Sequence, residues 1–367
     1  MLLLSAIFAA IGVTQPFLPA FLAARGLSPG EIALALALGS LARLLAGPAA
    51  GRWADALGDA RLLLGGLALL GLLVAGGFLA AAGLLGFILV QVLLGIAMAP
   101  QVPLADTLCL AAARQGLFDY GQVSAAGSVA FMAAAMLAGW LVGVWGYGAV
   151  PVLIGAAMLA TLAATLLMPR PPPRPPRPAR GGFGATLRLP GFARLLLLSG
   201  LIQSSHAAYY GFGSIHWTAA GHSTATIGLL WALGVVGEVV LFLLGRRLMA
   251  RAGPRGMALL AAGAGLLRWG LMASTVWLPA LALMQVLHAL TFGAQHLAAM
   301  HMILRLVPAE QAGTAQALHA ALGVGLLMGL LTLLSGPLYA AWGGGVFLLM
   351  ALLCGLALPL AWRLPAR

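Results

Sequence analysis

Apolar stretches of roughly twenty residues, separated by short polar or Gly/Pro-rich turns, run through most of the chain. They lack the alternation of apolar and polar positions that is typical of a membrane strand. Cutting the sequence at its charged and Gly/Pro-rich turns predicts about twelve membrane-spanning helices, at 2–24, 31–52, 62–82, 85–109, 122–145, 149–168, 195–217, 225–245, 257–276, 279–304, 312–338 and 344–362. We therefore expect an all-α integral membrane protein with short loops.

A proline- and arginine-rich segment interrupts this pattern near the middle of the chain. Proline at this density removes backbone donors, so the segment is expected to be an extended spacer and not a membrane helix. Its arginines could not cross a bilayer cheaply, which predicts a cytoplasmic location. The expected domains are an N-terminal six-helix bundle, 1–168, a linker, 169–194, and a C-terminal six-helix bundle, 195–367.

Composition and charge support a membrane location. The sequence is 62% hydrophobic and 7% charged, whereas soluble domains carry about 25% charged residues. The net charge of +12 does not indicate nucleic acid, because the loop arginines fall on one predicted side with the exception of Arg25. This positive-inside pattern predicts that both termini are cytoplasmic. Because no basic region precedes it, segment 2–24 is expected to be a spanning helix and not a cleaved signal.

The residues indicate neither an enzyme nor a metalloprotein. Cys109 and Cys354 fall in different spans and predict no disulfide, while His296 and His301 are five residues apart, on different faces of a helix. HExxH, GxSxG and nucleotide-binding motifs are absent from the sequence. We expect no cofactor and no metal.

The two halves resemble each other at a constant offset. At an offset of 195, Ser28, Ile32, Gly39 and Arg43 correspond to Ser223, Ile227, Gly234 and Glu238; at 194, Gln91 and Gln101 correspond to Gln285 and Gln295. Two related bundles predict a transporter whose halves rock about a site at the membrane midplane.

Ionisable residues inside the predicted spans are candidates for that site. Each costs about 2.5–3.5 kcal/mol in the bilayer, so each is expected to face a cavity and to have a partner. Arg43 and Glu238 occupy duplicated positions, Arg268 lies halfway through its span, and Asp106 lies toward the cytoplasmic end of the fourth. The alternative for Glu238 and Arg268 is a buried ion pair that only joins helices.

Two spans carry polar and aromatic side chains at helical spacing. In the seventh span these are Gln203, His206 and Tyr210, and in the tenth they are Gln285, His288, Phe292 and Gln295. Such faces suit a ligand with a flat apolar body and one polar end. The alternative is that the histidines and glutamines only link neighbouring helices.

The turn after the second span reads Gly51 to Arg61, GRWADALGDAR. It resembles the glycine, aspartate and arginine signature of the major facilitator superfamily. The resemblance implies two pseudo-symmetric six-helix bundles and a cytoplasmic gate formed by Asp55, Arg52 and Arg61. The corresponding turn of the second half has Met249 in place of the aspartate. A basic turn that serves only topology is the alternative.

A closer resemblance covers most of the chain. The run His206 to Phe212 (HAAYYGF), Arg268-Trp269-Gly270 and Pro103-Leu104 with Asp106 are similar to the bacterial 3-phenylpropionic acid transporters, a branch related to the oligosaccharide and nucleoside proton symporters. This resemblance implies a bacterial inner-membrane protein. By resemblance to the lactose permeases, Glu238, Arg268 and His288 join substrate binding to proton transfer, and Asp106 is a substrate-site position. Thr291 and Ser124 replace a carboxylate and an arginine of those relatives.

The resulting hypothesis is proton-coupled symport of a small aromatic monocarboxylate by alternating access. Arg43 or Arg268 would bind the carboxylate. Glu238 would carry the proton, with His288 as the second candidate. The remaining shell is expected to be Tyr210 and Phe292 against the ring, with Asp106, Gln203, His206 and Gln285 around it. Alternatives are a sugar or nucleoside symporter, an efflux pump and a transporter-like sensor; we expect a monomer that binds no nucleic acid.

Overall fold

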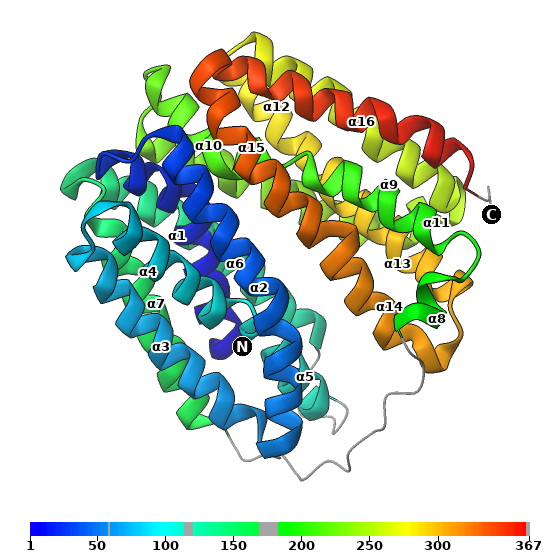
Figure 1. Ribbon diagram of the computed structural model, residues 1–367, viewed down its shortest axis with the longest axis horizontal. Helices are drawn as coiled ribbons and strands as arrows, with labels where there is room; N and C mark the ends of the chain where they lie inside the picture. The colour runs from blue at the N-terminus through cyan, green and yellow to red at the C-terminus, as the bar shows by residue number, and fades with distance from the viewer. Residues whose placement is uncertain (58, 114–119, 169–182, 365–367) are drawn as a thin grey trace. The chain divides into compact units, whose positions relative to one another are not determined.

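The computed structural model describes residues 1–57, 59–113, 120–168 and 183–364, and every regular element in these ranges is helical (Figure 1). The first half contains α1 (Leu2–Ala24), α2 (Pro29–Leu57), α3 (Ala60–Ala80), α4 (Gly83–Met98), α5 (Gln101–Ala113), α6 (Tyr120–Trp145) and α7 (Ala149–Leu167). The second contains α8 (Phe183–Leu187), α9 (Phe192–Ser204), α10 (Ala207–Ala219), α11 (Thr224–Ser274), α12 (Leu278–His288), η1 (Ala289–Ala294), α13 (Gln295–Leu306), η2 (Ala309–Gln311), α14 (Ala312–Leu318), η3 (His319–Gly325), α15 (Leu326–Trp342), η4 (Gly343–Gly345) and α16 (Val346–Trp362).

The helices have the length and composition of membrane spans. Within the described residues, nine stretches are long and apolar enough to cross a bilayer, and two of these are 51 residues long. A helix of that length measures about 76 Å, more than twice the hydrocarbon thickness, so each of the two holds two passes. The interrupted pair α9 and α10 adds one more pass, which agrees with the expected number.

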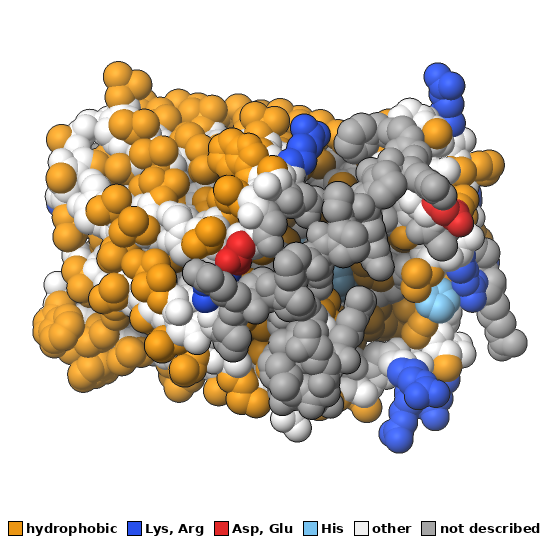
Figure 2. All heavy atoms as spheres, turned by 90° about the horizontal axis from the view of Figure 1, so that it is seen from below, with side chains coloured by type: hydrophobic (Ala, Val, Ile, Leu, Met, Phe, Trp, Pro, Cys, Tyr) orange, Lys and Arg blue, Asp and Glu red, His pale blue; other side chains and the backbone are white. Residues whose placement is uncertain are grey.

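The exposed surface is largely apolar, as a lipid bilayer requires. Figure 2 shows a face on which hydrophobic side chains cover much of the described surface and charged side chains occupy a few separate places. Large apolar side chains such as Leu73, Leu85, Leu243 and Leu348 are more than half exposed. Exposed leucines in this number have a favourable environment only against lipid tails.

The chain forms two compact units, which we describe separately. The first holds the described residues of Met1–Pro176 together with Phe212–Ala232, and the second holds those of Arg177–Gly211 and Leu233–Arg367. The segment Phe212–Ala232, which includes most of α10 and the start of α11, therefore packs with helices of the first half.

In the first unit, α1 packs against α6 and α7, α3 packs against α7, and α2 packs against α4. Glycines allow two of these close approaches. A Cβ atom at Gly12 would collide with the carbonyl oxygen of Phe131 in α6, and one at Gly95 would collide with the carbonyl oxygen of Gly39 in α2. Small residues at such contacts let helix backbones approach closely in a membrane.

In the second unit, the seventh span is interrupted where it contacts two π-helical segments. The seventh span breaks at Ser205-His206, between α9 and α10, while η1 and η3 are π-helical. Gln203 Nε2 donates to the carbonyl oxygen of Phe292 in η1 at 3.2 Å, and Ser204 Oγ donates to that of Val324 in η3 at 3.2 Å. Neighbouring residues at the end of α9 thus donate to carbonyls in both π-helices and join the three segments.

Several expected boundaries differ from those observed. The second span continues as α2 to Leu57, so most of the turn after it is helical. The expected spans 225–245 and 257–276 form α11, which bends at Gly253, where φ is +64°. The single α-helical face predicted for the tenth span does not continue through η1, because π-helical geometry changes the direction of successive side chains there.

Candidate functional site

Arg268 is the centre of a polar cluster inside the second unit. It lies in the second half of α11, and its side chain is completely buried. Its guanidinium carbon lies 4.2 Å from the ring centroid of Trp269 and 4.8 Å from that of Tyr209. Aromatic faces stabilise a cation at this distance, and they leave the edges of the guanidinium for hydrogen bonds.

One nitrogen of the guanidinium is saturated and the other two are not. Nη1 donates to Nδ1 of His288 at 3.0 Å and to Oγ1 of Thr291 at 3.1 Å. Nε and Nη2 are buried without a hydrogen-bond partner among the described residues. Each buried, unsatisfied donor costs about 1–3 kcal/mol or more. Nε and Nη2 together form the side of the guanidinium that matches a carboxylate with two parallel hydrogen bonds.

Glu238 is joined to Arg268 through His288. Nε2 of His288 lies 2.7 Å from Oε1 of Glu238. Because arginine can only donate, Nδ1 of His288 accepts from it, and the ring hydrogen is on Nε2, directed to the carboxylate. The three side chains form one hydrogen-bonded line from a cation to an anion.

His206 and Thr291 form a second branch from Arg268. Nδ1 of His206 lies 2.9 Å from the carbonyl oxygen of Gln203, and its Nε2 lies 3.1 Å from Oγ1 of Thr291. A carbonyl only accepts, so Nδ1 of His206 donates, and Nε2 of the neutral ring can accept the hydroxyl hydrogen of Thr291, for which the carbonyl oxygen of His288 at 3.1 Å is the other acceptor. Both residues are completely buried.

Aromatic rings surround these polar groups. The ring of His206 stacks on that of Tyr210 with centroids 5.6 Å apart, and His288 stacks on Phe292 at 5.5 Å. Trp269 packs edge-on against His206 at 5.1 Å. The unit therefore combines a buried cation with several flat apolar surfaces.

Ser205 and Gln285 hold two of the rings. The indole Nε1 of Trp269 donates to Oγ of Ser205 at 2.9 Å. The hydroxyl of Tyr209 donates to Oε1 of Gln285 at 2.9 Å, while Nε2 of Gln285 is buried without a partner in the described part of the chain. The free end of Gln285 is therefore a donor, like the free edge of Arg268.

The structure brings together eight of the predicted site residues in the second unit. These are Gln203, His206, Tyr210, Glu238, Arg268, Gln285, His288 and Phe292. The donor group of Gln203 is already used by the carbonyl of Phe292.

The other two predicted substrate residues lie in the first unit. Arg43 is exposed, and the described residues give it neither a hydrogen bond nor an ion pair. Asp106 is half-buried, and its Oδ1 accepts a hydrogen bond of 2.7 Å from the hydroxyl of Tyr120.

The predicted gate residues also belong to the first unit. Arg52 is exposed, and the side chain of Asp55 lies outside the described residues. Arg61 donates to the carbonyl oxygen of Met168, and its Nε lies 3.8 Å from Asp59, which caps the start of α3. The resemblance did not single out Asp59 for any role.

Sequence reasoning missed four members of the cluster. Tyr209, Trp269 and Ser205 have no predicted role, and Thr291 is noted only as a departure from the relatives. The only available signal was their position: each is adjacent to a predicted site residue or one helical turn away from it.

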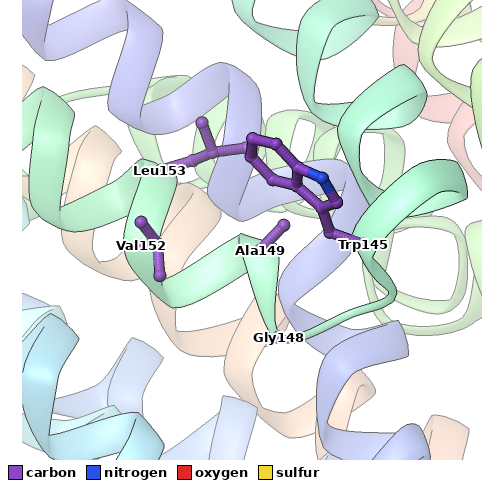
Figure 3. A pocket seen from close by; sticks show the side chains of 5 residues that line it. All are labelled: Trp145, Gly148, Ala149, Val152 and Leu153. Atoms are coloured by element: carbon purple, nitrogen blue, oxygen red, sulfur yellow. The ribbon is translucent and has the colours of Figure 1, made fainter.

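Two hollows in the first unit are separate from this chemistry. One, of about 230 Å³, is lined by Trp145, Gly148, Ala149, Val152 and Leu153 at the turn between α6 and α7 (Figure 3). The other, of about 250 Å³, lies between α2, α3 and α4 and is also apolar. Among the described residues, no three His, Cys, Asp or Glu side chains are grouped to hold a metal ion.

Multi-pass helices with a buried polar cluster inside the second unit are typical of a membrane transporter. The comparison with protein families agrees, since the model of the MFS_1 like family matches residues 2–350. The chain belongs to this family and thus to the major facilitator superfamily.

Curated relatives are transporters as well. The chain is 38% identical, over 367 aligned residues, to the "Probable 3-phenylpropionic acid transporter" of Escherichia coli (strain K12), covering 98% of this chain and 94% of the relative. It is 29% identical over 274 residues to the maltose permease of Geobacillus stearothermophilus, covering 73% and 68%.

Solved structures confirm the fold. A mutant of the nucleoside transporter NupG superposes with a TM-score of 0.83 at 15% identity, covering 98% of this chain and 96% of that chain. A bacterial homologue of the lysosomal transporter Spinster, inward-facing and unoccupied, gives 0.73 at 15% identity, covering 98% and 94%. At these identities the likeness concerns the fold alone.

Proposed function

We propose that this transporter carries a small aromatic monocarboxylate, such as 3-phenylpropionate, together with a proton by alternating access. The observation that carries the proposal is the free edge of Arg268: Nε and Nη2 are buried without partners among the described residues, and two aromatic rings lie close to the guanidinium. A carboxylate satisfies such an edge with two charge-assisted hydrogen bonds. The name of the Escherichia coli relative, at 38% identity, supports the same substrate class.

The aromatic rings supply the rest of the recognition. Tyr210 and Phe292 are both partly exposed, unlike the fully buried Arg268 beside them, so they are the surfaces on which a substrate ring can lie. Gln285 offers a second unpartnered donor for the carboxylate. Gln203 and His206 are proposed to position this shell, and Arg43 and Asp106 are proposed to contribute from the first unit.

Charge balance explains why a proton accompanies the substrate. Without substrate, the cluster contains one cation, Arg268, and one carboxylate, Glu238, joined by His288. A substrate carboxylate adds a second negative charge to one guanidinium. Protonation of Glu238 restores neutrality, because burial favours the uncharged form of a carboxyl once its cation is engaged elsewhere. Release of the substrate reverses both events.

Further features belong to the same proposal. The distribution of arginines supports cytoplasmic termini in a bacterial inner membrane. Arg52, Arg61 and Asp55 are proposed to close the cytoplasmic gate. We propose a monomer, since one chain contains the two related halves that alternating access requires.

Uptake in proteoliposomes tests the proposal. Purified protein is reconstituted, and entry of labelled 3-phenylpropionate, lactose and uridine is compared with and without an inward proton gradient. We expect the gradient to drive accumulation of 3-phenylpropionate only. Accumulation of lactose or uridine in its place would reject the substrate class, and accumulation that ignores the gradient would reject proton coupling.

A further inference from the structure

Thr291 is one of the two groups that hold the saturated end of Arg268. Its Oγ1 accepts from Nη1 at 3.1 Å, while Nδ1 of His288 accepts from the same nitrogen at 3.0 Å. Both acceptors are uncharged, since Thr291 is a hydroxyl and His288 presents the lone pair of a neutral ring. The cation is thus oriented by two partners that do not neutralise it.

The position of Thr291 is fixed by its surroundings. It is completely buried in η1, and its hydroxyl also contacts Nε2 of His206 at 3.1 Å and the carbonyl oxygen of His288 at 3.1 Å. A hydroxyl has one hydrogen and two lone pairs, so it can accept from Arg268 and donate to either of the other groups. Thr291 has little freedom to turn away from the guanidinium.

No carboxylate of the described residues makes a salt bridge with Arg268. The two salt-bridge contacts within these residues are Arg61 with Asp59 and His288 with Glu238. Glu238 therefore has no salt bridge with the guanidinium, and the His288 ring supplies the hydrogen-bonded connection between the two. A buried cation without a direct counter-ion is costly, and an incoming anion removes that cost.

We propose that Thr291 is a specificity-determining residue, because its neutral hydroxyl orients Arg268 while leaving the guanidinium charge for an anionic substrate. A carboxylate at this position would pair directly with Nη1 and make the cluster prefer an uncharged ligand. This inference rests on the proposed function, since it assumes that a carboxylate binds to the free edge of Arg268. It adds that Thr291, which contacts the guanidinium of Arg268, selects anions over neutral molecules of the same shape.

The test compares an acid with its neutral amide. Binding of 3-phenylpropionate and of 3-phenylpropionamide to the purified full-length protein is measured by calorimetry for wild type, Thr291→Asp and Thr291→Asn. Asn is the matched control because it has the shape of Asp without the charge. We expect Thr291→Asp to weaken acid binding by about 30-fold or more and amide binding by less than about threefold. Thr291→Asn keeps the preference for the acid.

The outcomes separate the two proposals. A wild-type protein that does not prefer the acid overturns the proposed function. If Thr291→Asp retains the wild-type preference for the acid, the role of Thr291 is overturned and the proposed function stands. The same conclusion follows if Thr291→Asn loses the preference for the acid. If Thr291→Asp does not purify as a single species, binding of the same acid and amide to Glu238→Gln is measured instead. This variant lacks the carboxylate that is bonded to His288, so its preference for the acid must be equal to or greater than that of wild type. A tenfold decrease in the preference overturns the inference.

Discussion

Nη1 of Arg268 lies 3.0 Å from Nδ1 of His288, and the other nitrogen of the same ring lies 2.7 Å from Glu238. The imidazole can serve both neighbours only in its neutral form with the hydrogen on Nε2. A change at Arg268 is therefore transmitted to Glu238 through one ring, and any ligand that draws the guanidinium away weakens the hold on the carboxylate.

Glu238→Gln should separate binding from proton coupling. The amide keeps the shape and can still accept from His288, but it cannot take up a proton. We expect exchange of 3-phenylpropionate across proteoliposomes without a gradient to continue, and gradient-driven accumulation to be lost. Full accumulation by this variant would show that the coupled proton is carried elsewhere.

Arg268→Lys should bind the substrate much more weakly although it keeps the charge. Lysine has no planar pair of N–H groups to match a carboxylate, and its three donors share one nitrogen, so donation to His288 and Thr291 leaves a single N–H for the substrate. Loss of a buried charge-assisted pair costs about 2–5 kcal/mol, which corresponds to about 30-fold or more in affinity for 3-phenylpropionate.

The control for this experiment is Arg246→Gln. Arg246 is exposed and belongs to the same unit. Its variant should bind 3-phenylpropionate like wild type when measured by calorimetry. Wild-type affinity in Arg268→Lys would mean that the carboxylate does not use the free edge of the guanidinium.

The fold could be predicted because the membrane restricts the possibilities. Apolar length alone gives the number of passes. The interruptions could not be predicted. Neither the break at Ser205-His206 nor the π-helical turn Ala289–Ala294 has a proline or a charged residue to signal it. Both depend on partners from distant helices, such as Gln203 for the carbonyl oxygen of Phe292.

Members of the polar cluster were predicted where a side chain is charged or strongly polar, and they were missed where it is small or aromatic. Arg268, Glu238 and His288 were identified because a polar group in hydrocarbon needs a reason. Thr291 and Ser205 are small hydroxyl residues that any membrane helix tolerates, so their contacts with Arg268 and Trp269 could not be predicted. Tyr209 is not part of the predicted shell, which has Tyr210 on the helical face of His206, yet the ring of Tyr209 lies against Arg268.

Ser205→Ala should destabilise the second unit through Trp269. The substitution leaves the buried indole N–H without its acceptor, and it also removes the partner of the thiol of Cys354, which lies 3.4 Å from Ser205 Oγ. We expect the free energy of unfolding to fall by about 1–3 kcal/mol. Thermal unfolding of the purified protein, followed by tryptophan fluorescence, measures the change.

Ser274→Ala is the matched control for Ser205→Ala. Ser274 is exposed, and its hydroxyl donates to a carbonyl of its own helix at 3.1 Å. Its loss should leave the midpoint of unfolding nearly unchanged. Equal midpoints for the two variants would contradict the structural role of Ser205.

Gly139→Ala and Gly228→Ala should each disturb the packing of α6 against the start of α11 within the first unit. A Cβ atom at Gly139 would collide with the carbonyl oxygen of Thr224, and one at Gly228 with that of Ala135. Oγ1 of Thr224 also donates to the carbonyl oxygen of Gly139 at 2.7 Å, which holds the backbones together. Because neither backbone can move aside cheaply, each methyl group should lower the free energy of unfolding by about 1–3 kcal/mol. Gly148→Ala is the control, since a Cβ atom there meets no atom within 4 Å. Thermal unfolding of the three variants in detergent checks the prediction, which fails if the midpoints of Gly139→Ala and Gly148→Ala coincide.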